Sequence, residues 1–68
     1  MRIGTKVRLT KTARDETYAD MSWKNDTMII THKHDEHGDI GCLYSFDNLS
    51  DPKDEITCSM YSYELRKV

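Results

Sequence analysis

The fold is decided by one stretch of the sequence, Trp23 to Phe46, which reads WKNDTMIITHKHDEHGDIGCLYSF. Its first part, Thr27–His32, is made of β-branched and apolar residues and predicts a strand. Its last part, Cys42–Phe46, predicts a second strand, and the polar segment Lys33–Gly41 between them carries two glycines. Two such runs around a polar, glycine-bearing segment indicate a β-hairpin.

The residues before this hairpin predict one more strand and a long connection. Lys6–Thr10 alternates polar and apolar residues, which is the period of a half-buried strand, so Val7 and Leu9 are expected to face the core. The segment Thr12–Ser22 is polar with only a weak apolar periodicity. An irregular loop, a loop containing a helical turn and a short helix all fit this segment.

The residues after the hairpin predict a loop, a short strand, a turn and a closing strand. These are, in order, Asp47–Glu55, Ile56–Cys58, the 3₁₀ turn Ser59–Tyr63 and the strand Glu64–Val68. If the loop is symmetric about Ser50, Tyr44 lies opposite Ile56 and Cys42 lies opposite Cys58. The two cysteines are then either reduced, buried thiols or a cross-strand pair.

The composition limits the size of the core and the class of protein. Sixty-eight residues predict a single domain, 1–68, and with 37% hydrophobic residues the core is small and draws on Met, Tyr and Trp. A net charge of −2 argues against a strongly basic nucleic-acid-binding protein. No apolar run is long enough for a signal core or a membrane span, so a soluble, cytoplasmic protein without a membrane partner is expected.

The two ends of the chain resemble those of SH3-like barrels. The opening Gly4–Leu9, GTKVRL, resembles the first strand of SH3-like and KOW-type barrels, and the closing ITCSMYSYELRKV of Ile56–Val68 resembles their short strand, 3₁₀ turn and last strand. Tyr63 would hold the tyrosine of that turn. The resemblance, which extends to small phage-encoded barrels, implies an all-β, five-stranded SH3-like barrel with a long first loop. The paired tryptophan and aromatic cluster that bind proline-rich ligands in SH3 domains are absent, so that activity is not implied.

The first functional hypothesis is a non-enzymatic interaction module. The sequence has no nucleotide-binding fingerprint and no arrangement typical of a catalytic nucleophile, so neither an enzyme nor a cofactor is expected. An accessory protein of a phage or mobile element, bound to another protein, fits these features. Its candidate contact residues, with Trp23 expected to be part-exposed, are Tyr18, Trp23, His34, His37 and Tyr61.

Two alternatives follow from the charged residues. A nucleic-acid-binding, KOW-like barrel would use a basic face drawn from both ends of the chain, consisting of Arg2, Lys6, Arg8, Lys11, Arg14, Arg66 and Lys67. A metal- or pH-responsive module would instead use the histidines of the hairpin turn, His32, His34 and His37. A charged, solvated hairpin tip explains the same histidines without any ligand.

Overall fold

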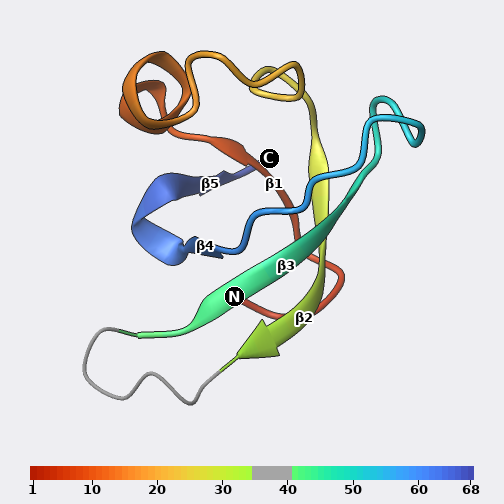
Figure 1. Cartoon of the computed structure of the whole chain (residues 1–68). Coiled ribbons are helices and arrows are strands. Elements are labelled where there is room, and N and C mark those ends of the chain that lie inside the picture. Colours follow the sequence, from red (N-terminus) through yellow and green to blue (C-terminus); the bar gives the residue numbers. More distant parts are fainter. Residues whose placement is uncertain (35–40) are drawn as a thin grey trace.

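The chain folds into one antiparallel sheet of five strands, shown in Figure 1 as a computed structural model whose described residues are 1–34 and 41–68. The strands follow one another across the sheet in the order β4-β3-β2-β1-β5. Their bounds are β1 Lys6–Leu9, β2 Met28–His34, β3 Leu43–Asn48, β4 Met60–Tyr61 and β5 Leu65–Lys67. The prediction of an all-β fold with five strands is confirmed.

The two edge strands of this sheet, β4 and β5, are neighbours in the chain. The 3₁₀ turn η3, Ser62–Glu64, is the whole connection between them. Three residues span at most about 10 Å of extended chain, so the two edges lie close together and the sheet curls around a core. The predicted 3₁₀ turn before the last strand is confirmed, although it starts later than the predicted Ser59–Tyr63.

The alternation in β1 sets which side of the sheet meets the core. Val7 and Leu9 are buried and Lys6 is exposed, as the period-two pattern predicts. The turn that leads into β1 uses Gly4, whose φ of 91° lies in the region that favours glycine. The Gly4 N–H donates to the Ile30 carbonyl at 2.8 Å, so this turn is fastened to β2.

The central hairpin is confirmed, with strands that run further than predicted. β2 continues to His34, two residues into the predicted turn, and β3 continues past Phe46 because Asn48 still pairs with Met28. Tyr44 and Phe46 face the core from β3. Residues 35–40 of the predicted turn, with Gly38 and His37, lie outside the described residues, whereas Gly41 at its end has a φ of 91°.

The first connection is a loop that contains one wide helical turn, η1, Ala13–Thr17. The Tyr18 N–H donates to the Ala13 carbonyl at 2.8 Å, a spacing of five residues that makes the turn wider than an α-helix. Ala13 is buried against the core. Of the readings that the sequence left open, a loop with a helical turn inside it is the one observed.

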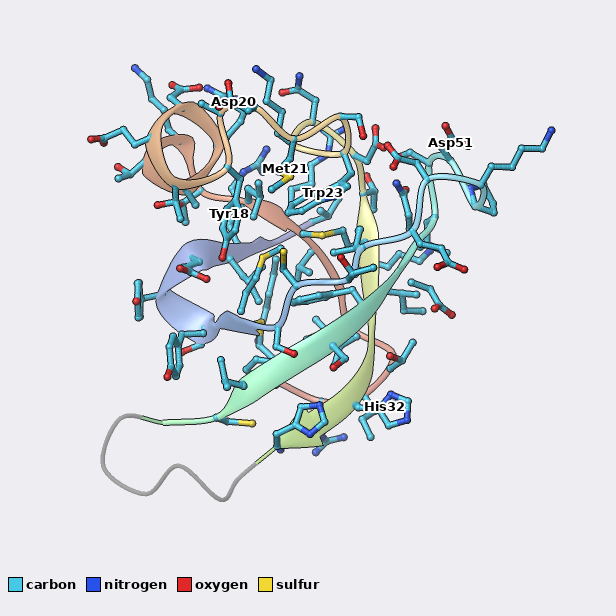
Figure 2. All side chains as sticks on the ribbon, viewed as in Figure 1. Tyr18, Asp20, Met21, Trp23, His32 and Asp51 are labelled. Carbon is cyan, nitrogen blue, oxygen red and sulfur yellow. The ribbon has the colours of Figure 1, made fainter. Side chains whose placement is uncertain are left out.

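The prediction that Trp23 is part-exposed is wrong. Only 4% of Trp23 is exposed, and its ring lies 5.4 Å from that of Tyr18, measured between centroids. Figure 2 shows both side chains directed from the first connection toward the sheet. A core short of large aliphatic residues is completed by the biggest apolar side chain available, so the connection packs over the sheet instead of extending into solvent.

The predicted strand Ile56–Cys58 is also wrong. On its side away from β2, β3 pairs with β4. Tyr44 therefore lies opposite Met60 rather than opposite Ile56, and Cys42 is not placed opposite Cys58. Both cysteines are free, half-buried thiols that pack against the core. The loop between β3 and β4 is therefore not the symmetric hairpin loop about Ser50 that the sequence predicts.

The side chain of Asn48 explains why that loop is asymmetric. Its Nδ2 donates to Asp26 Oδ2 at 2.8 Å and to the Asp54 carbonyl at 3.1 Å, while its Oδ1 accepts from the Asp51 N–H at 3.0 Å. Asn48 is 5% exposed, so losing any of these partners would leave a buried polar group unsatisfied. These bonds fold the start of the loop back onto the end of β3.

The burial of Trp23 predicts a stability effect. Trp23→Ala should lower the free energy of unfolding by about 3–5 kcal/mol, because it leaves a cavity and loses apolar burial. Urea denaturation of the variant measures this change, with Trp23→Phe as a milder step. The exposed Tyr63→Ala is the control and should stay within about 0.5 kcal/mol of the parent. A Trp23→Ala variant as stable as this control would contradict a buried Trp23.

Candidate functional site

Basic side chains meet on the outer face of β1 and β5. Arg8 lies directly opposite Arg66 in the register of these strands, and the flanking Leu9 and Leu65 form the next pair. Because the leucines are buried, the alternation along each strand puts the two arginines on the other face of the sheet. Like charges directly opposite one another destabilise a sheet. A local cost of this kind is expected where a surface serves binding.

Two further cations come from the first connection. Arg14 and Lys24 lie with Arg8 and Arg66 around a hollow of about 160 Å³ on this side of the protein, the basic hollow. Its four cations come from β1, from the connection that directly follows it, and from β5 near the other end of the chain. The remaining residues around it are Leu9 and Asn25.

The polar contacts of the basic hollow leave most of its charge unpaired. Arg8 Nε donates to Thr27 Oγ1 at 3.1 Å and Lys24 Nζ donates to the Ala19 carbonyl at 2.9 Å, so both partners are neutral. Arg14 Nε forms an ion pair with Asp15 Oδ1 at 2.9 Å. Within residues 1–34 and 41–68, the side chain of Arg66 has no hydrogen bond or ion pair.

The Arg14–Asp15 pair is a solvent-exposed ion pair. The hydrogen bonding in which Arg14 donates to Asp15 holds the pKa of Asp15 below its ordinary value and raises the pKa of Arg14. Pairs of this kind are screened by salt and contribute little to stability. Arg14 can therefore exchange Asp15 for a stronger anionic partner.

The structure brings together only part of the predicted basic face. Arg8, Arg14 and Arg66 lie around the basic hollow, whereas the other four predicted residues are exposed and do not border it. Those four are Arg2, Lys6, Lys11 and Lys67. Lys24 is the residue that sequence reasoning missed, because its place depends on the path of an irregular connection.

The predicted partner residues are buried or half-buried wherever the structure describes them. Tyr18 is half-buried, and its hydroxyl donates to Glu64 Oε2 at 3.0 Å. Tyr61 stacks on Tyr63, with ring centroids 5.6 Å apart and planes 11° from parallel. Trp23 is buried and offers no side-chain surface to a partner.

The two described histidines of the predicted metal site form a pair. The rings of His32 and His34 stack with centroids 6.2 Å apart, as expected for alternate residues on one face of β2. His34 Nε2 lies 2.8 Å from Ser45 Oγ, and His32, labelled in Figure 2, has Nδ1 3.0 Å from Thr31 Oγ1. His37 lies outside the described residues. The part of the chain that the structure describes holds no group of three or more metal-ligating side chains, and the metal site stays a prediction.

No protein-family model matches this sequence, and no curated protein or solved structure is significantly similar to it. The likeness to SH3-like and KOW-type barrels therefore stays a prediction from the sequence. Among the described residues, no helix has the length and apolar character needed to cross a lipid bilayer.

Tyr18 generates a prediction on the dependence of stability on pH. Burial raises the pKa of the Tyr18 hydroxyl above its ordinary value, and the hydrogen bond to Glu64 raises it further. Because the folded pKa lies above the unfolded one, the stabilisation is complete below about pH 10 and is lost as the pH rises beyond it. Tyr18→Phe keeps the ring but has no proton to lose.

Urea denaturation at neutral and at strongly alkaline pH tests this effect. Tyr18→Phe should be about 1 kcal/mol less stable than the parent at neutral pH, because one hydrogen bond is lost. It should then lose less stability than the parent as the pH rises. Tyr63→Phe, at an exposed tyrosine, should follow the parent at both values. An equal alkaline loss in the parent and in Tyr18→Phe would show that this hydroxyl has no such role.

Proposed function

We propose that the protein is a non-enzymatic binding module that holds nucleic acid against the basic hollow. The observation that carries this proposal is the convergence of Arg8, Arg14, Lys24 and Arg66 on one small surface. Guanidinium groups match the geometry of phosphate oxygens and can donate two parallel hydrogen bonds to them. Three of these four side chains have no anionic partner among the described residues. A bound phosphate group would supply that partner.

The net charge of −2 is compatible with this function because Asp15 offsets only one of the four cations, Arg14, and two other carboxylates that are near in sequence are engaged elsewhere. Asp26, two residues after Lys24, accepts from Asn48 and is thereby directed toward β3. Glu64, two residues before Arg66, accepts from Tyr18 and from the Tyr61 N–H. The local charge that a phosphate group meets is therefore positive.

Contacts of this kind predict affinity for phosphate with little preference for base sequence. Phosphate contacts position a nucleic acid but do not read its bases. Binding should be weak at physiological salt and should tighten as the salt concentration falls, because each contact releases condensed counterions. A cytoplasmic location, where nucleic acid is accessible, belongs to the same proposal.

Docking on another protein is the second candidate, and the exposed Tyr63, stacked on the half-buried Tyr61, is the feature that favours it. Tyrosine is enriched in protein interfaces because it combines a large apolar ring with a hydroxyl. An accessory protein of a phage or mobile element that docks on a host protein would use this surface instead of the basic hollow.

Salt-dependent binding of nucleic acid tests the first candidate. Fluorescence anisotropy of a labelled oligonucleotide, titrated with the protein at several salt concentrations, gives the affinity and its salt slope. The double variant Arg8→Gln/Arg66→Gln should weaken binding at low salt. It should also reduce the slope of log affinity against log salt by about 1.4 for a single strand or about 1.8 for a duplex, because two phosphate contacts are lost.

A charge-matched control makes this test specific. Lys33→Gln/Lys53→Gln removes the same two charges from exposed positions that do not border the basic hollow. This control should bind like the parent apart from a small loss that salt screens. Equal weakening in both double variants, or no binding by the parent at low salt, would refute the proposal.

A further inference from the structure

We infer that Tyr61 and Tyr63 form a stacking platform for the bases of a single-stranded nucleic acid whose backbone lies in the basic hollow. This inference rests on the proposed function and names the kind of nucleic acid bound. Proteins that hold single strands combine a positively charged surface for the backbone with aromatic rings on which bases stack. Both parts are present here.

Tyr63 is exposed and stacks on the half-buried Tyr61. Tyr63 is 73% exposed, so its ring adds little to the core, and its stacking on Tyr61 leaves one face for a further planar group. The turn beneath it is held by the Tyr61 N–H, which donates to Glu64 Oε2 at 3.3 Å. Little conformational freedom remains to be lost when a base stacks there.

The tyrosine pair and the basic hollow are close in space. Tyr63 precedes Arg66 by three residues, so their Cα atoms are at most about 10 Å apart. The residues between them do not obstruct the surface. Leu65 is buried, and the carboxylate of Glu64 is held by the Tyr18 hydroxyl and the Tyr61 N–H.

A second hollow, of about 290 Å³, borders Tyr63. It lies between η1 and η3 and is bordered by three threonines, Thr10, Thr12 and Thr17, together with Ala13, Tyr63 and Glu64. Thr10 directly follows Leu9 of the basic hollow, and this makes the two hollows neighbours along the chain. Threonine hydroxyls can donate to phosphate or sugar oxygens. The surface thus runs from the Tyr63 ring past threonine hydroxyls, and past a Glu64 carboxylate that accepts from Tyr18 and Tyr61, to the cations.

This arrangement favours a single strand over a duplex. In a duplex the bases are already stacked on one another and their faces are covered, so the tyrosines would have nothing to stack on. A duplex would use the cations alone. A single strand can use the cations and the tyrosines together.

Anisotropy titrations with four probes test the inference: an oligothymidylate, a duplex of the same length, an abasic oligonucleotide of the same length, and heparin. The oligothymidylate should bind the parent protein most tightly. Tyr63→Ala should weaken this binding by about five- to hundredfold, as expected for the loss of one stacked base. Tyr63→Phe, which keeps the ring, should retain it.

The abasic probe separates stacking from charge. It should bind the parent about as weakly as oligothymidylate binds Tyr63→Ala, and Tyr63→Ala should not weaken it further. Leu49→Ala, at an exposed apolar residue that borders neither hollow, is the control and should leave every affinity unchanged. Thermal unfolding of each variant confirms that it is folded.

The outcomes separate this inference from the proposed function. Equal effects of Tyr63→Ala on abasic and base-bearing strands, or a duplex bound as tightly as the single strand, overturn the stacking platform and leave the proposed function in place. Heparin bound as tightly as oligothymidylate also overturns the platform, because heparin offers charge without bases. If no probe binds at low salt, both proposals fail, and the tyrosine pair is then a surface for a protein partner.

Discussion

The burial of one small apolar core is the constraint on which the rest of this structure depends. Among the described residues, eleven apolar side chains form the core, and only five of them are Val, Leu or Ile. Trp23, Met28, Tyr44, Phe46 and Met60 supply most of the remaining volume. Because Trp23 and Ala13 belong to the first connection, that connection must pack over the sheet to complete the core. The first connection, whose sequence is that of a polar loop, is therefore part of the packed core.

This packing also places the cations of the basic hollow. Each of them is next in sequence to a buried residue: Arg14 follows Ala13, Lys24 follows Trp23, Arg66 follows Leu65, and Arg8 lies between Val7 and Leu9. Burying the apolar neighbour fixes the backbone at that point and leaves the charged side chain to reach the surface. The same contacts that stabilise the fold thus assemble the candidate site from β1, the connection that follows it, and the distant β5.

Local patterns were sufficient to predict four of the five strands and the central hairpin, but not β4 or its pairing with β3. The alternation that places Val7 and Leu9 in the core depends only on neighbouring residues and is confirmed. The prediction of a strand at Ile56–Cys58 was wrong because the side chain of Asn48 folds the preceding loop back onto the end of β3. No local periodicity in the sequence indicates this fold. Lys24 was missed for the same reason, since its position follows from the tertiary burial of Trp23. Arg8 and Arg66 were identified as basic residues, but their pairing required the register between β1 and β5.

The arrangement of hydrogen bonds explains how an acidic protein can keep a cationic surface. Asp26 is held by Asn48, Asp54 by Ser22 at 2.6 Å, and Glu64 by Tyr18, so these carboxylates are fixed in contacts of their own. Arg66 has no such contact with the described residues. At physiological salt the screening length is about 8 Å, which is short compared with the protein's extents of 30 × 24 × 20 Å. A charged group that touches the basic hollow therefore responds to the four cations there, and the net charge of the whole chain matters mainly for its approach from a distance.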